Sequence, residues 1–128
     1  MRAVLDTSVF VADEQGRQLD TSAIPEEAAV SIVTLAELEL GVHLASSGQI
    51  RAARLVTLRA VQSSYESLPI DDDVASSFAQ LVATARAAGR RPKVQDAWIA
   101  ATALAHAAAV VTQDRDFDDF ADVDVIRV

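Results

Sequence analysis

Short apolar segments that alternate with longer helical patterns are the feature of this sequence that most constrains its fold. Ala3–Leu5 is a continuous apolar run that ends at an acid, as expected for a strand buried on both faces. Similar short segments lie at 28–32, 67–70, 110–111 and 123–128, the last with the alternation of an edge strand. Strands that alternate with helices predict an α/β domain with a largely parallel sheet.

Helical patterns fill the intervals between these segments, at 7–13, 34–44, 49–64, 71–88 and 96–108. Polar loops separate them at 14–25 and at the basic stretch 90–93. The 128 residues fit one domain, so we expect a single domain over 1–128. In such open sheets, ligands bind beyond the carboxyl ends of the strands.

The charge balance argues against a protein that binds nucleic acid by bulk electrostatics. The chain has 19 acids against 11 basic residues and a net charge of -8, whereas such proteins are normally basic. The exception is an acidic protein whose carboxylates hold divalent cations, because cations bring phosphates to an acidic site. The absence of cysteine excludes disulfides, thiolate zinc sites and a cysteine nucleophile.

Individually, the acids near the predicted strand ends and helix starts have ordinary explanations. Asp6 and Asp96 suit helix caps or first-turn acids, which the helix dipole favours. Thr34 and Glu37 fit a capping box, in which Glu37 would bond back to the Thr34 backbone. Two more acids lie in a turn-like segment after the strand at 110–111, namely Asp114 and Asp116.

Together, these acids indicate a metal site. Strand ends and helix starts share one rim of a parallel sheet, so carboxylates from four separate segments would meet there. They would repel and raise one another's pKa unless cations lay between them. Oxygen ligands suit Mg²⁺ or Mn²⁺. A pair of such ions activates water and stabilises the leaving oxygen in in-line phosphoryl transfer.

Four segments resemble the PIN domain in order and spacing, and most closely the VapC-type toxins of bacterial toxin–antitoxin pairs. They are Leu5–Ser8, Thr34–Leu38, Gln95–Ala103 and Val111–Phe117. The resemblance covers essentially the whole chain. It implies a three-layer fold with a five-stranded parallel sheet flanked by helices. It also implies metal-dependent endoribonuclease cleavage that leaves a 5′-phosphate and a 3′-hydroxyl.

The resemblance also assigns site residues and partners. It implies a catalytic, Mg²⁺- or Mn²⁺-binding cluster, with hydroxyls at Thr7 and Thr112 that help to order it. Relatives often have Asn where this chain has Gln95 before the third acid. The expected partners are an RNA substrate, a second copy in a homodimer, and a cognate VapB-type antitoxin whose tail enters the active site. The implied cluster is Asp6, Glu37, Asp96 and Asp114, with Asp116 as a further metal ligand.

Other polar and aromatic residues leave alternatives open. The basic loop is either an ordinary solvated loop or an RNA-backbone contact through Arg90, Arg91 and Lys93. Trp98 packs in the core or a dimer face, or stacks on a nucleobase. The two histidines, His43 and His106, are expected to be structural, because no partner spacing supports a zinc site.

Three other functions compete with a nuclease. A phosphatase that forms an aspartyl-phosphate would need an acid at Ser8, and a phosphoacceptor domain would need a lysine near the last strands. A non-catalytic PIN-like binding module is the main alternative, although all four acids are present. The acid at position six argues against a secretory signal, and no apolar run is long enough for a membrane helix, so we expect a cytoplasmic protein.

Overall fold

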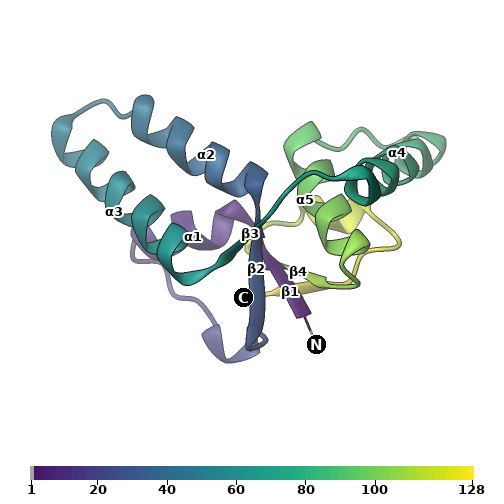
Figure 1. The fold of residues 1–128 in the computed structure, drawn as a ribbon, viewed down its shortest axis with the longest axis horizontal. Helices are drawn as coiled ribbons and strands as arrows, with labels where there is room; N and C mark the ends of the chain where they lie inside the picture. The colour runs from purple at the N-terminus through teal and green to yellow at the C-terminus, as the bar shows by residue number, and fades with distance from the viewer. Residues whose placement is uncertain (1) are drawn as a thin grey trace.

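A five-stranded sheet in which every neighbouring pair of strands is parallel forms the centre of the molecule (Figure 1). The structure is a computed structural model and describes residues 2–128. The strand order is β3-β2-β1-β4-β5. This topology confirms the predicted α/β fold with a five-stranded parallel sheet. The strands are β1 (Arg2–Leu5), β2 (Glu27–Ser31), β3 (Glu66–Leu68), β4 (Ala109–Thr112) and β5 (Val125–Arg127).

Helices cover both faces of the sheet and form the outer two layers (Figure 1). One face carries α1 (Thr7–Glu14), α2 (Ile32–His43) and α3 (Gly48–Ser64), and the other carries α4 (Asp72–Ala87) and α5 (Val94–Ala105). Two short 3₁₀ turns complete the chain, η1 (Thr21–Ala23) and η2 (Asp116–Asp119). Within residues 2–128, no helix has the length and apolarity needed to span a bilayer.

Alternate residues of the central strands supply two separate cores. Leu5 of β1 and Val111 of β4 pack with α1, α2 and α3. Their neighbours Val4 and Val110 pack with α4 and α5. This alternation follows from the strand geometry, in which successive side chains point to opposite faces. It explains why both strands read as continuous apolar runs in the sequence.

The start of α2 differs from its prediction. The helix begins at Ile32, and its N-cap is Ser31, whose hydroxyl accepts a hydrogen bond from the Val33 amide at 3.1 Å. Thr34 therefore lies inside the first turn and is fully buried. The predicted capping box between Thr34 and Glu37 is wrong, because Thr34 is not the capping residue. Glu37 is left free to face the carboxyl edge of the sheet.

The predicted boundaries of α5 were also displaced. This helix begins at Val94, so Asp96 is a first-turn acid and not its cap. It ends at Ala105 because Ala107 adopts a left-handed conformation, with φ of 51°. The Ala108 amide then donates to the Ala103 carbonyl at 2.8 Å, which closes the helix end. Among residues 2–128, Ala107 is the one non-glycine residue with positive φ.

The left-handed Ala107 predicts a stabilising substitution. Ala107→Gly is expected to raise the free energy of unfolding by about 0.5–1 kcal/mol, because glycine adopts positive φ without the Cβ penalty. Thermal unfolding should show a melting temperature about 2–4 °C higher. Ala52→Gly, at an exposed interior position of α3, is the matched control and should destabilise by about 1 kcal/mol. Destabilisation by Ala107→Gly would contradict the assigned backbone conformation.

Candidate active site

Five acidic side chains from four parts of the chain line one cavity of about 400 Å³, called here the acidic cavity. One comes from the end of β1, one from α2, one from α5, and two from the segment after β4. The carboxyl ends of parallel strands and the starts of the following helices meet at this edge of the sheet. The acids are Asp6, Glu37, Asp96, Asp114 and Asp116.

Asp6 is the most buried of these acids, with 3% of its surface exposed. It caps α1, and its Oδ2 accepts hydrogen bonds from the Ser8 hydroxyl at 2.6 Å and the Thr112 hydroxyl at 3.0 Å. Burial raises the pKa of Asp6, with a smaller contribution from the charge of Asp114, while the hydroxyls oppose that rise. The three bonds accepted by Asp6, including one from the Ser8 amide, all go to Oδ2.

Two hydroxyl groups connect Asp6 with the backbone of the segment after β4. The Ser8 hydroxyl accepts from the Gln113 amide at 3.1 Å, and the Thr112 hydroxyl accepts from the Asp114 amide at 3.0 Å. Thr112 is fully buried, so its hydroxyl is held in one place. Asp6 and the backbone that carries Asp114 are therefore fixed relative to each other by the same two side chains.

Glu37 projects toward the cavity from the second turn of α2. Its Oε1 accepts a hydrogen bond from the Thr7 hydroxyl at 2.7 Å, and Thr7 also contacts the Thr34 hydroxyl at 3.1 Å. Partial burial raises the pKa of Glu37, and the negative charge of Asp6 adds to that rise. Thr7, in the first turn of α1, thus orients a carboxylate that lies 30 residues further along the chain.

Among the acids of the cavity, Asp96 has the surroundings that best fit a cation ligand. Its Oδ2 is buried and has no hydrogen-bond partner among the described residues. Burial, followed by the charges of Asp6 and Asp116, raises the pKa of Asp96 to about 7, although Lys93 opposes the rise. A buried carboxylate oxygen without a partner is costly, so its presence calls for an explanation such as an ion.

Asp114 and Asp116 lie on the segment between β4 and η2. Asp114 is exposed, whereas Asp116 is half-buried and pairs with Lys93 at 3.4 Å between Oδ2 and Nζ. Phe117 follows directly and is fully buried in the core beneath α5. The buried ring anchors the segment, so both acids stay at the cavity although their own side chains reach solvent.

The acids fit a divalent cation in chemistry but do not form a closed cage. No three carboxylate or imidazole groups within residues 2–128 are gathered tightly enough to hold a metal ion by themselves. Carboxylates in one cavity repel one another unless a cation lies between them. The donors are all oxygens, the ligands that Mg²⁺ and Mn²⁺ favour, and Asp96 Oδ2 lacks any other partner. The residues therefore fit a hard cation that draws them together.

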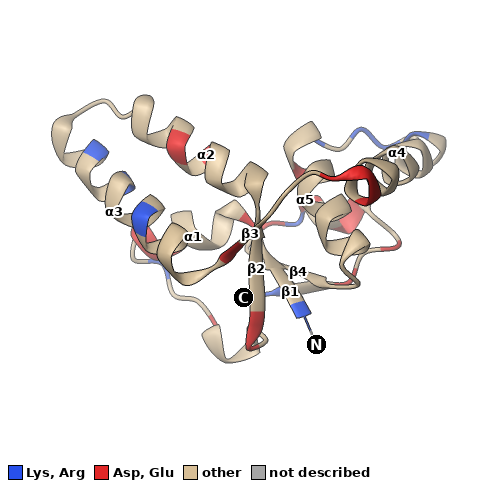
Figure 2. Cartoon of the chain, in the orientation of Figure 1, with Lys and Arg blue, Asp and Glu red and all other residues tan. Residues whose placement is uncertain are grey.

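The three basic residues predicted to contact RNA lie at two different places in the structure. Lys93 lines the acidic cavity, whereas Arg90 and Arg91 line a separate hollow with Arg86 and Gly89. Figure 2 shows basic residues on α3 and on the loop between α4 and α5. A direct role of Arg90 and Arg91 in binding RNA stays a prediction, and it would act outside the cavity.

Sequence reasoning missed Ser8 and Arg17 as residues of the site. Ser8 holds Asp6 and the Gln113 amide together, and the Asp-x-Ser spacing of an Asp-capped helix was a signal for it. Arg17 lies in a polar loop after α1 and lines the cavity, although nothing in the local sequence marks it. Gln95, the predicted departure from the family pattern, is exposed at the same cavity.

Trp98, whose role the sequence left open, packs against another aromatic ring. Trp98 stacks on Phe78 of α4, with ring centroids 3.7 Å apart and planes inclined by 15°. This contact supports the core assignment for Trp98. His43 ends α2 and is exposed, and His106 follows α5. Neither histidine lines the acidic cavity.

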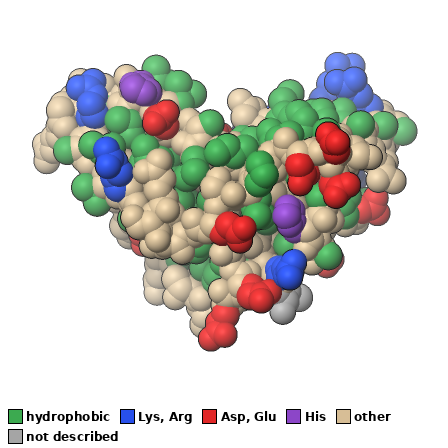
Figure 3. Space-filling view, viewed as in Figure 1, with side chains coloured by type: hydrophobic (Ala, Val, Ile, Leu, Met, Phe, Trp, Pro, Cys, Tyr) green, Lys and Arg blue, Asp and Glu red, His purple; other side chains and the backbone are tan. Residues whose placement is uncertain are grey.

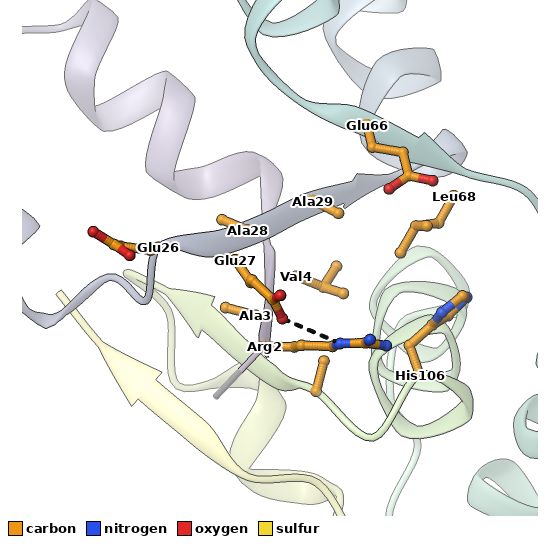
Figure 4. A pocket seen from close by; sticks show the side chains of 11 residues that line it. Arg2, Ala3, Val4, Glu26, Glu27, Ala28, Ala29, Glu66, Leu68 and His106 are labelled. Atoms are coloured by element: carbon orange, nitrogen blue, oxygen red, sulfur yellow. Dashed lines mark hydrogen bonds and ion pairs between the residues drawn. The ribbon is translucent and has the colours of Figure 1, made fainter.

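A second cavity of about 400 Å³ lies at the amino ends of the strands (Figure 4). Its lining includes Glu66, Leu68 and His106, and also an exposed Arg2–Glu27 pair with 3.2 Å between Nε and Oε2. Ligands of open parallel sheets bind at the opposite edge. The acidic cavity is therefore the better candidate for the active site.

Comparisons with known proteins show the family of this chain. The family model described as the PIN domain matches residues 3–123. This chain belongs to the PIN domain family. It is 51% identical to ribonuclease VapC5 of Mycobacterium tuberculosis, over 98% of this chain and 94% of the relative. It is 45% identical to ribonuclease VapC4 of the same organism, over 99% of this chain and 97% of the relative.

Solved structures similar to this PIN domain come from toxin–antitoxin systems. The VapBC-5 structure from Mycobacterium tuberculosis matches with a TM-score of 0.91 and 46% identity, covering all of both chains. The FitAcB structure from Neisseria gonorrhoeae matches with a TM-score of 0.77 and 31% identity, over 97% of this chain and 96% of the other. Together with the ribonuclease names of the sequence relatives, these matches identify a VapC-type ribonuclease toxin.

The raised pKa of Asp96 makes the metal-free PIN domain less stable as pH rises. The folded chain keeps a proton on Asp96 that the unfolded chain releases at its ordinary pKa of 3.8. The resulting stabilisation is complete below pH 3.8 and is lost as pH rises through about 7. Asp96→Asn should remove this loss and melt about 3 °C higher than wild type at pH 8 without metal.

Melting curves across this pH range, with and without Mg²⁺, check the prediction. Mg²⁺ should raise the melting temperature of the wild type more than that of Asp96→Asn, because a ligand stabilises the state that binds it. Asp122→Asn, which changes an exposed acid outside the cavity, is the control. Asp96→Asn melting below wild type at pH 8 in chelator would contradict the unfavourable burial of this carboxylate.

Proposed function

We propose that this PIN domain is a divalent-cation-dependent endoribonuclease that leaves a 5′-phosphate and a 3′-hydroxyl. The main observation in its support is the Asp96 oxygen, which is buried and has no partner among the described residues, in a cavity shared with four further carboxylates. The named relatives are ribonucleases, which supports RNA as the substrate. The proposed catalytic and metal-binding residues are Asp6, Glu37, Asp96 and Asp114, with Asp116 as a further metal ligand.

The chain's own residues would bind and orient the reacting groups. Bound Mg²⁺ or Mn²⁺ would activate water and stabilise the leaving oxygen during in-line displacement. Ser8 and Thr112 fix the Asp6 carboxylate from one side, and Thr7 fixes Glu37 from the other. Their hydrogen bonds determine which oxygens stay available for a ligand, as residues behind metal ligands commonly do.

The proposed protein partners are a cognate VapB-type antitoxin and a second copy of the chain. Similar solved structures are of VapBC and FitAcB. Large apolar side chains are exposed on the α2–α3 side, including Leu40 (55%), Leu44 (69%) and Val56 (69%). Figure 3 shows hydrophobic side chains gathered along the upper edge of one face. Such exposed apolar surface is typical of a protein-binding region.

Cleavage of total cellular RNA by the purified, antitoxin-free protein tests the proposal. We expect discrete cuts with Mg²⁺ or Mn²⁺, no cuts in chelator, and restored cutting when the metal is returned. A 5′-phosphate-dependent exonuclease should degrade the downstream fragments, because their ends carry phosphate. Cutting that persists in chelator, or fragments with 5′-hydroxyl ends, would contradict the mechanism. A folded protein that leaves total RNA intact would favour the non-catalytic module.

A further inference from the structure

The acidic cavity presents an electrostatic difficulty for an RNA substrate. Five carboxylates line it, and the whole chain carries a net charge of -8. Phosphate contacts with arginine or lysine supply essentially all of the non-specific affinity of proteins for nucleic acids and a large share of the specific affinity. A bound cation would offset charge at the reacting phosphate, but neighbouring phosphates of the strand would still need partners. The protein must therefore offer positive charge beside the carboxylates.

Two basic side chains among the described residues line the acidic cavity, and they come from opposite layers of the molecule. Arg17 follows α1, which packs on one face of the sheet, and Lys93 immediately precedes α5, which packs on the other. All five acids line the same cavity as these two cations. A strand that crosses the carboxylates would therefore meet one cation on each side.

Both cations are available for an anion. Within residues 2–128, Arg17 forms no salt bridge, and its Nη2 donates to the neutral side chain of Gln15 at 2.9 Å. Arginine has five N–H donors, so most of its donors stay free. Lys93 pairs with Asp116 at 3.4 Å, but its side chain is 73% exposed. An exposed pair of this kind contributes little and is easily exchanged for another anion.

We propose that Arg17 and Lys93 bind phosphates of the RNA strand on the two sides of the carboxylate cluster. This inference rests on the proposed nuclease function and adds substrate-positioning residues to it. Lys93 exchanges its contact with Asp116 for a phosphate when RNA binds, which also frees Asp116 to face the cavity. The remote arginines of α3, including Arg59, make no such contact because they lie outside the cavity.

RNA binding measured in an Asp96→Asn background tests the proposal, because that variant is expected to bind without cutting. The probe is a short, fluorescently labelled single-stranded RNA of randomised sequence, titrated at several salt concentrations with Mg²⁺ present. Arg17→Ala and Lys93→Ala should each weaken binding about threefold to tenfold. Each should reduce the magnitude of the slope of log K against log salt by about 0.7.

Matched variants separate charge from structure. Arg17→Lys should keep most of the affinity, Arg17→Glu should lose more than Arg17→Ala, and Arg59→Ala should match the parent in affinity and salt slope. In the active protein, Arg17→Ala should raise KM for RNA with little change in kcat, because the lost contact is made equally before and during reaction. Equal melting temperatures establish that the variants are folded.

Each outcome either supports or overturns the assignment. Wild-type affinity and salt slope in Arg17→Ala or Lys93→Ala would overturn it for that residue, as would RNA binding that shows no salt dependence. Equal losses in Arg59→Ala would show diffuse attraction and would also overturn it. Failure of the nuclease proposal is distinct, because it appears as cleavage that survives Asp96→Asn in an otherwise wild-type chain.

Discussion

Asp96→Asn is expected to lower RNA cleavage by at least about 100-fold while the protein stays folded. The side chain keeps its shape but loses the charge that a divalent cation needs, at the one buried side-chain oxygen within residues 2–128 that has no partner. Asp6→Asn should have a similar effect, since its amide cannot accept the same hydroxyl contacts and bind a cation. Cleavage rates with saturating Mg²⁺, and growth of cells that produce each variant, measure the loss.

The control for this prediction is an acid of the same type outside the cavity. Asp122 is exposed and does not line the acidic cavity, so Asp122→Asn should cleave RNA at the wild-type rate. Asp96→Asn should also no longer arrest growth, whereas Asp122→Asn should arrest it as the wild type does. Full activity of Asp96→Asn in a folded protein would exclude the proposed chemistry. Loss of activity in Asp122→Asn would indicate a general effect of charge.

Phe117→Ala is expected to lower the free energy of unfolding by about 3–5 kcal/mol. The ring is fully buried in the core with Phe120, and its removal would leave a cavity beneath the segment that carries Asp114 and Asp116. The melting temperature should fall by about 10 °C or more. Cleavage should also fall at temperatures well below the transition, because the two acids lose their anchor. Urea unfolding measures the loss of stability. The slope of the unfolding free energy against urea concentration should be the same as in the wild type.

A core variant from the other face separates stability from positioning. Leu58 of α3 is 3% exposed and belongs to the second core, away from the segment after β4. Leu58→Ala should cost about 2–5 kcal/mol but leave cleavage near the wild-type level below its own transition. Equal loss of cleavage in both variants would show that Phe117 contributes only general stability. A larger loss in Phe117→Ala would support its role in holding the acids.

The fold was predictable because its strongest signals are local. Strands buried on both faces appear as short apolar runs, and the intervening helices are long enough to show their periodicity. Boundaries were less predictable where one residue decides them. Ser31 competes with Thr34 as the cap of α2, and the left-handed Ala107 ends α5 inside an unbroken alanine-rich segment. These choices depend on packing that a local pattern does not contain.

The sequence by itself determined the order of strands and helices and the acids that follow the strand ends, because parallel strands share one carboxyl edge. Only the tertiary structure decided which groups hold those acids. Ser8 and Thr112 lie 104 residues apart, yet their hydroxyls meet at 3.2 Å over Asp6. Arg17 and Lys93 reach the same cavity from opposite layers. Such pairings arise from chain crossovers, which place distant residues together without leaving a local pattern.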